Sequence, residues 1–319
     1  MIVTVASGKG GTGKTTITVN LAASAPEGTV EVFDCDVEEP NAYLFVNPKN
    51  IVKEEISTMI PVVDMNLCTL CGECEKICRF SAINLIAKRI MIFPEMCHSC
   101  RGCSMVCPSG AIKESSRVLG SILAGYSSLG FSLTWGELRV GEAMSPPLIK
   151  QVKKKIRPGK LALVDAPPGT SCPAVATLRD SDFALLVTEE TPFGLNDLAL
   201  TVGALKKLDI PMGIVINRSD SGNCKAGKSV SGKHIAEKGI IDEYAQREGI
   251  TIMQRFPFSR EAARVCAKGL LLVDEIPEMK TLFQELYLGI MSQVGSGNKI
   301  YETEKNIPGL SCKEMAGAR

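Results

Sequence analysis

The sequence predicts an α/β protein in which a doubly wound, mostly parallel sheet is interrupted by a small α+β module. Apolar runs of strand length alternate with helical stretches through most of the 319 residues, as in βαβ units. A glycine-rich loop follows the first apolar run and opens the first helical stretch. Eight of the 13 cysteines lie close together between these stretches, and they define the interrupting module.

The overall composition excludes several classes of protein. Hydrophobic residues make up 45 % of the chain and the formal net charge is +1, which allows a large core and gives no strong nucleic-acid signal. No apolar stretch approaches the ~18 residues of a membrane span, and the first residues lack the charged-then-apolar order of a signal peptide. We therefore expect a cytoplasmic protein without a membrane anchor. So many cysteines in such a protein indicate metal binding rather than disulfides.

The glycine-rich loop has the composition of a phosphate-binding loop. Residues 8–16 read Gly-Lys-Gly-Gly-Thr-Gly-Lys-Thr-Thr, with the P-loop spacing of glycines, lysine and threonine. Glycines let backbone N–H groups surround a phosphate, and a helix that begins near Lys14 adds its positive N-terminal end. We expect Lys14 to reach the β- and γ-phosphates and Thr15 to hold Mg²⁺, which a plain glycine-rich turn would not require. The residues predicted to bind nucleotide here are Gly8, Lys9, Gly10, Gly11, Thr12, Gly13, Lys14, Thr15 and Thr16.

Acidic residues end two further predicted strands. The strand that starts at Val30 ends in Asp34 and Asp36, and the strand that starts at Lys160 ends in Asp165. Ligands bind beyond the carboxyl ends of the strands in such sheets. An aspartate there can hold Mg²⁺ through water, and a following glycine, here Gly169, can sense the γ-phosphate. A second interpretation of the aspartate at position 36 is a cap for the next turn.

The cysteine block contains two runs with the same spacing, C-x2-C-x2-C-x3-C. The second run ends in Cys-Pro, as in bacterial ferredoxins, whereas Arg79 follows the first. In two-cluster ferredoxins the fourth cysteine of each run ligates the other cluster. The first predicted [4Fe–4S] cluster therefore uses Cys68, Cys71, Cys74 and Cys107, and the second uses Cys78, Cys97, Cys100 and Cys103. The alternative, zinc, favours two short pairs of ligands over a closely spaced triple.

The cysteine module is expected to span residues 60–116 and to resemble a whole bacterial-type ferredoxin. It divides the P-loop domain into a first part, residues 1–59, and a second part, residues 117–294, with a flexible tail at 295–319. Further strands are predicted at Phe183–Thr188, Met212–Asn217 and Ile250–Gln254, and helices at Leu195–Leu208, His234–Arg247 and Pro277–Val294. A mobile loop is predicted at Ser219–Lys233.

The second lysine of the loop, Lys9, adds a family resemblance. Ser-Gly-Lys-Gly-Gly-Thr-Gly-Lys-Thr-Thr resembles the deviant P-loop of the MinD, ParA, Mrp and nitrogenase iron protein class of ATPases. The resemblance implies an ATP-sandwich homodimer in which Lys9 acts on phosphates of the partner subunit. It also implies that Asp36 orients the attacking water and that Asp165 and Gly169 belong to switch II. For the base, it implies that Asn217 hydrogen-bonds adenine and that Pro257 and Phe258 pack against it.

A MinD-type ATPase with an inserted ferredoxin is itself a family that this chain resembles over nearly its whole length. The resemblance implies ATP or ADP, Mg²⁺ on Thr15, Asp36 and Asp165, and two [4Fe–4S] clusters as cofactors. The expected function is ATP hydrolysis coupled to nucleotide-gated electron transfer or to redox-regulated contact with a redox or cluster-accepting partner. The alternatives are an iron–sulfur cluster carrier or assembly factor and a MinD/ParA-like spatial organiser with a redox switch. No role is assigned to Cys35, Cys172, Cys224, Cys266 or Cys312.

Overall fold

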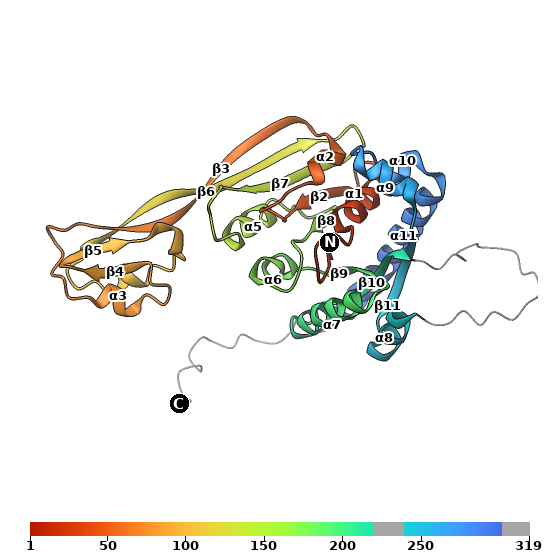
Figure 1. Cartoon of the computed structure of the whole chain (residues 1–319). Coiled ribbons are helices and arrows are strands. Elements are labelled where there is room, and N and C mark those ends of the chain that lie inside the picture. Colours follow the sequence, from red (N-terminus) through yellow and green to blue (C-terminus); the bar gives the residue numbers. More distant parts are fainter. Residues whose placement is uncertain (220–238, 302–319) are drawn as a thin grey trace, which may run out of the picture.

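The large sheet dominates the structure, a computed structural model that describes residues 1–219 and 239–301. Within these residues nine strands form one sheet, in the order β11-β10-β9-β1-β8-β2-β7-β6-β3 (Figure 1). The strands are β1 (Ile2–Ala6), β2 (Val30–Asp34), β3 (Lys49–Val63), β6 (Ile112–Tyr126), β7 (Ser132–Leu138), β8 (Leu161–Asp165), β9 (Phe183–Glu189), β10 (Met212–Ser219) and β11 (Thr251–Pro257).

The sheet is mostly parallel, as predicted. The neighbours from β11 to β7 all pair in parallel, whereas β6 pairs antiparallel with β7 and β3 pairs antiparallel with β6. Central strands such as β8 are buried along their whole length. Strands covered on both faces must be apolar throughout, which explains the continuous hydrophobic runs of the sequence.

Helices cover both faces of the sheet. They are α1 (Lys14–Ser24), α2 (Ala42–Val46), α5 (Pro146–Lys153), α6 (Cys172–Leu178), α7 (Pro192–Lys207), α8 (Ile240–Glu248), α9 (Arg260–Ala267), α10 (Leu272–Glu275) and α11 (Pro277–Tyr301). One core joins Ile17 of α1 and Phe283 of α11 to Leu163 of β8. The neighbouring residue Val164 faces the opposite core, with α5 and α6. The fold is therefore doubly wound (Figure 1).

The predicted strands near residues 183, 212 and 250 are confirmed as β9, β10 and β11, and the predicted helix at 195–208 is α7. The helix predicted at 234–247 begins at Ile240, and residues 220–238, which include most of the predicted loop and Cys224, lie outside the described residues.

The last helix is longer than predicted. It continues to Tyr301, so the tail expected from residue 295 does not begin there. Each glycine in a helix interior costs only about 1 kcal/mol relative to alanine, and no proline occurs between residues 278 and 307. Residues 302–319, which include Cys312, lie outside the described part of the chain. Among the described helices, none is long and apolar enough to cross a membrane.

A long antiparallel ribbon of β3 and β6 carries the cysteine block away from the sheet (Figure 1). β6 pairs with β7 only from Gly120 to Tyr126. The register shifts at this point, because Ile56 pairs with Gly120 but Ser57 pairs with Val118. The extra residue, Leu119, is a bulge, a feature that bends and twists a strand. We call residues 57–119 the arm; the predicted module boundaries, 60 and 116, fall within its two strands.

The end of the arm has little apolar core of its own. Its elements are α3 (Glu73–Ile77), β4 (Ile83–Ile86), β5 (Arg89–Ile92), the 3-10 turn η1 (Pro94–Met96) and α4 (Gly102–Met105). Its one core cluster of buried residues consists of Cys74, Ile83 and Ile112, with further cysteines packed around them. So small a cluster cannot offset the conformational entropy of the segment unaided.

Candidate functional site

The phosphate-binding loop has a backbone that only glycine accommodates well. Gly11 and Gly13 have φ angles of 78° and 95°, and α1 begins directly after the second of them. At Gly8, an added Cβ would lie 2.3 Å from the carbonyl oxygen of Asp197 in α7. Glycine is therefore required at these three positions, by backbone conformation at Gly11 and Gly13 and by close packing at Gly8.

The loop also has the features of a cradle for a ligand. A Cβ added at Gly10 or Gly11 would meet no atom within 4 Å. The hydroxyl of Thr12 is buried and has no hydrogen-bond partner among the described residues. The side chain of Lys14 is buried at the start of α1. A bound phosphate would supply an acceptor for these donors, so the residues present fit a nucleotide.

The predicted Mg²⁺ residues of the loop and of β8 are in contact. Thr15 Oγ1 donates a hydrogen bond of 2.5 Å to Asp165 Oδ2, and Thr18 Oγ1 lies 3.4 Å from Asp165 Oδ1. Burial raises the pKa of Asp165 well above its ordinary value, and the nearby Asp34 acts in the same direction. A buried carboxylate that faces other carboxylates favours a cation, which suits it to Mg²⁺.

The two aspartates after β2 have different environments. Asp34 is fully buried and accepts hydrogen bonds from the backbone N–H groups of Asp36, Asn41 and Ala42 at 3.0–3.1 Å. Burial raises its pKa to about 6. Asp36 is less buried, and desolvation together with the charge of Asp34 raises its pKa to about 7. Asp34 thus shapes the turn, while Asp36 is free to face a ligand.

The segment after β8 approaches the phosphate loop. The N–H of Gly169 donates to the carbonyl of Ser7 at 2.9 Å, and Gly169 has a φ angle of 86°. Pro167 and Pro168 line an open groove of about 660 Å³ together with Asp36. The structure therefore brings both predicted switch segments to the same edge of the sheet.

Lys9 has a partner that sequence reasoning missed. Its Nζ lies 3.1 Å from Oε2 of Glu189, the last residue of β9. Glu189 also binds Arg218, whose Nη1 lies 2.6 Å from the other carboxylate oxygen. The available signal was a pair of acidic residues at the carboxyl end of an apolar strand.

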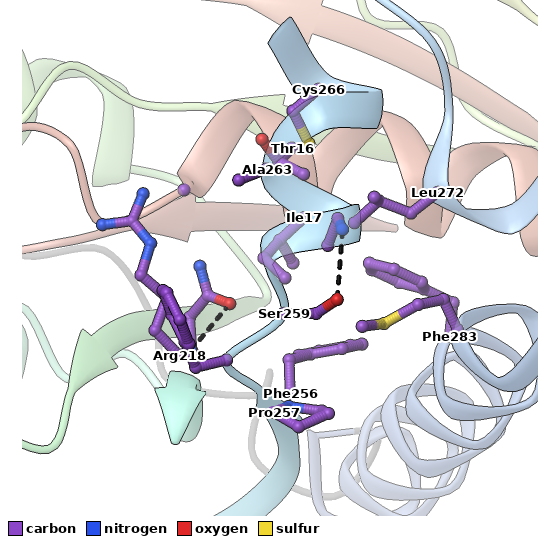
Figure 2. A pocket seen from close by; sticks show the side chains of 15 residues that line it. Thr16, Ile17, Arg218, Phe256, Pro257, Ser259, Ala263, Cys266, Leu272 and Phe283 are labelled. Carbon is purple, nitrogen blue, oxygen red and sulfur yellow. Dashed lines mark hydrogen bonds between the residues drawn. The ribbon is translucent and has the colours of Figure 1, made fainter. Parts of the chain in front are cut away.

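A pocket of about 230 Å³ lies beside the loop, between α1, α9 and α11 (Figure 2). It is lined by Asn217, Pro257 and Phe258, the three residues predicted to contact the base. Asn217 already uses both ends of its amide, since Nδ2 donates to the Thr12 carbonyl at 2.7 Å and Oδ1 accepts from the backbone of Arg218. Its contact with adenine stays a prediction.

The eight cysteines of the arm surround two separate small cavities. One is lined by Cys68, Cys71, Cys74 and Cys107, and the other by Cys78, Cys97, Cys100 and Cys103. The structure thus brings together the same two sets that the ferredoxin spacing predicts, with the fourth cysteine of each run beside the other run's triple. In the described residues, no three His, Cys, Asp or Glu side chains are placed to share one metal ion.

The backbone of the arm repeats with the cysteines. Positive φ angles occur at Leu70 and Ser99, at Gly72 and Arg101, and at Ser81 and Gly110, each pair 29 residues apart (99 − 70, 101 − 72 and 110 − 81). The cysteines of the two runs have the same separation, as from 68 to 97. Non-glycine residues adopt such angles only at a cost, so the two halves share one backbone conformation around their cysteines.

Comparison with known families decides the class of the protein. Residues 3–273 match the family described as the CobQ/CobB/MinD/ParA nucleotide binding domain. The chain belongs to this family. It is therefore a P-loop ATPase of the MinD/ParA type.

Relatives of this ATPase include proteins of named and unnamed function. An uncharacterized protein of Methanocaldococcus jannaschii is 30 % identical over 90 % of this chain and 95 % of its own length. An iron–sulfur cluster carrier protein of Pyrococcus horikoshii is 24 % identical over 93 % of this chain and 89 % of its own length.

Solved structures resemble the ATPase in fold. The cell division ATPase MinD of Pyrococcus furiosus has a TM-score of 0.51 at 19 % identity, covering 92 % of this chain and 98 % of that protein. A ParA family ATPase of Chlorobium tepidum has a TM-score of 0.53 at 14 % identity, covering 90 % and 98 %. At this level of identity the likeness concerns the sheet and its helices.

Proposed function

We propose that this ATPase couples a Mg²⁺-dependent cycle of ATP binding and hydrolysis to two [4Fe–4S] clusters in its arm, in nucleotide-gated electron transfer or redox-regulated contact with a partner. The observation that carries the proposal is the pair of four-cysteine cavities on one antiparallel ribbon. That ribbon starts shortly after Asp36, the predicted switch I residue, because only α2 separates β2 from β3. A change at the nucleotide thus has a short path to the arm.

Each cysteine set would hold one cluster, the first with Cys107 as fourth ligand and the second with Cys78. Such clusters supply one-electron transfer when bound. The backbone N–H groups of Ala82 and Ser99 donate to the Sγ atoms of Cys78 and Cys97 at 3.3 and 3.4 Å, which are contacts that tune cluster potentials. We assign the ferredoxin-like module to residues 60–116 and the ATPase domain to the flanking segments.

The nucleotide roles follow from the geometry of the loop. Lys14 and the loop amides would hold the phosphates. Thr15, Asp36 and Asp165 would position Mg²⁺. Asp36 would also orient the attacking water. Lys9 is about one-third exposed, so it can leave Glu189 and reach the phosphates of a second copy of the chain. Asn217, Pro257 and Phe258 would contact the base from the adjoining pocket.

Redox potentials measured in two nucleotide states test this function. The protein is purified without oxygen, and the cluster midpoint potentials are measured with Mg²⁺·ADP and with a non-hydrolysable ATP analogue. We expect the potentials, or the affinity for a redox partner, to differ between the two states. Equal potentials and equal partner affinities would exclude the coupling while leaving the ATPase assignment intact.

A second candidate function is that of a cluster carrier. The observation that favours it is the 24 % identity to proteins named iron–sulfur cluster carriers, which extends over most of both chains. Transfer to an apoprotein acceptor distinguishes the candidates. A carrier would lose its iron to the acceptor within minutes and restore the acceptor's activity, whereas an electron-transfer protein would keep its iron through repeated redox cycles.

A further inference from the structure

A buried ion pair joins the base of the arm to the loop that follows β7. The guanidinium of Arg117 on β6 binds the carboxylate of Glu142 with two nitrogens, Nη1 to Oε2 and Nη2 to Oε1, the latter at 3.0 Å. Their side chains are 9 % and 0 % exposed. The remaining nitrogen, Nε of Arg117, is buried and has no partner among the described residues. Glu142 is therefore the group that holds this guanidinium.

The Glu142 side of the pair is attached to switch I. Glu142 accepts the N–H of Met144 at 3.2 Å, which orders the loop between β7 and α5. At one end of that loop the N–H of Leu138 donates to the carbonyl of Val37 at 2.9 Å. At the other end Ser145 Oγ donates to Glu38 Oε1 at 2.8 Å. Both acceptors directly follow Asp36, so the loop cannot stay in place if switch I moves.

The Arg117 side of the pair is attached to the second cysteine set. Arg117 lies opposite Thr58 on the ribbon, two residues from the bulge at Leu119. The hydroxyl of Thr58 is 2.6 Å from the hydroxyl of Ser99, which itself donates to the carbonyl of Met59. The N–H of Ser99 donates to Cys97 Sγ at 3.4 Å. The second set is also the set nearer to the sheet, since its cavity is lined by Met59 whereas the other is lined by Val63 and Ile112, farther along the ribbon.

We propose that Arg117 and Glu142 are positioning residues that transmit the nucleotide-dependent movement of switch I to the second cysteine set of the arm. The inference rests on the proposed coupling and names its path. A buried charge cannot leave its partner without a large desolvation cost, and a bidentate guanidinium–carboxylate pair fixes orientation as well as distance. A shift of the Glu142 loop therefore carries Arg117 and the base of the ribbon with it.

A double variant with a matched control tests the path. Removal of one partner alone strands a buried charge and endangers folding, so the test variant is Arg117→Met with Glu142→Leu, an apolar replacement of similar size. The control is Lys155→Gln with Glu54→Gln. In that pair Lys155, just after α5, lies 2.5 Å from Glu54 of β3. Both side chains are about half exposed, and neither contacts switch I.

The readout is hydrogen–deuterium exchange of the full-length, iron-loaded protein with and without a non-hydrolysable ATP analogue. Wild type and control are expected to show about fivefold or greater slowing of amide exchange around residues 95–103 when the analogue binds. The double variant is expected to bind the analogue with similar affinity, yet to show less than about a twofold change there. Because coupling is reciprocal, iron removal should alter analogue affinity in wild type but not in the double variant.

The possible results separate the inference from the proposed function. A double variant that keeps the wild-type response would overturn the role of the ion pair and leave the coupling itself intact. If the control variant lost the response as well, Arg117 and Glu142 would have no role that the exposed pair lacks. That result would also overturn the inference. If amide exchange in the arm of the wild type does not change when the analogue binds, both the proposed coupling and the proposed path are wrong.

Discussion

Lys9 Nζ lies 3.1 Å from Glu189 Oε2 within one chain. The residue that the family resemblance assigns to the phosphates of a partner subunit is thus held by a carboxylate of its own subunit. Glu189 also binds Arg218 at 2.6 Å, so it keeps a cation when Lys9 departs. In the proposed dimer, Glu189 would therefore compete with the partner's nucleotide for the ammonium group of Lys9.

Glu189→Gln is expected to favour nucleotide-dependent dimers. The amide keeps hydrogen-bonding capacity but loses the charge that retains Lys9. Partly exposed ion pairs contribute about 0.2–1 kcal/mol, so the dimer dissociation constant should fall by up to about fivefold. Sedimentation equilibrium with a non-hydrolysable ATP analogue measures this change.

The control for that experiment is Glu248→Gln, which removes the partner of Lys206 far from the loop and should leave dimerisation unchanged. Lys9→Ala should abolish nucleotide-induced dimers while some ATP binding persists. A Lys9→Ala protein that dimerises normally would remove the role in trans, and a Glu189→Gln protein that dimerises more weakly would show that the carboxylate supports the dimer instead.

Asp165→Asn is expected to separate stability from activity. Asp165 is buried near Asp34, and burial raises its pKa, so a neutral amide should keep or increase the stability of the metal-free protein. The same change removes the charge that attracts Mg²⁺ and the acceptor charge for Thr15. We expect ATP hydrolysis to fall by about 100-fold or more, measured as phosphate release over a Mg²⁺ titration.

Asp209→Asn serves as the matched control because Asp209 is exposed in the turn after α7, and it should hydrolyse ATP normally. If Asp165→Asn lowered the melting temperature by many degrees, the carboxylate would be a structural acceptor for Thr15 and Thr18 first. Hydrolysis at the wild-type rate would exclude Asp165 from the metal site.

Those parts of the site that depend on a local sequence pattern could be predicted from the sequence. Apolar runs predicted β9, β10 and β11, and glycine spacing predicted the loop before α1. Partners brought together by register or by loop packing were not predictable. Glu142 meets Arg117 two residues from the bulge at Leu119, and no periodic pattern of the sequence indicates either the bulge or the contact. The two cysteine sets could be predicted because their spacing is that of the two-cluster ferredoxins.

The metal-free protein is expected to lose stability as the pH rises from about 4 to about 7. The folded-state pKa values of Asp34 and Asp36 are raised to about 6 and about 7, mainly by burial. The folded state therefore holds protons that the unfolded chain releases near pH 4, so stability falls as pH rises through this window. Melting temperatures in EDTA should drop by several degrees, and Mg²⁺·ADP should reverse the drop because bound cation favours the ionised carboxylates.

Asp36→Asn identifies the contribution of one group to that slope. The variant should have a shallower pH dependence in EDTA than wild type, and Asp209→Asn should not differ from wild type. The chain has only 2 histidines, and the main other contribution to this slope comes from Asp165, whose pKa burial also raises. Stability that increased toward pH 7 in EDTA would mean that Asp34 and Asp36 are ionised in the folded protein at low pH.

Paired cysteine variants test the exchanged fourth ligands of the arm. Anaerobic wild type should contain about eight iron atoms per chain. Since Cys78 lines the cavity of Cys97 and not that of Cys68, Cys78→Ala with Cys97→Ala should damage one cluster and leave about four irons. Cys78→Ala with Cys68→Ala should damage both clusters and leave almost none, and proteolysis should then cut the poorly packed arm while the ATPase sheet survives. The reverse pattern, with four irons retained by the second pair only, would mean that each run of cysteines holds its own cluster.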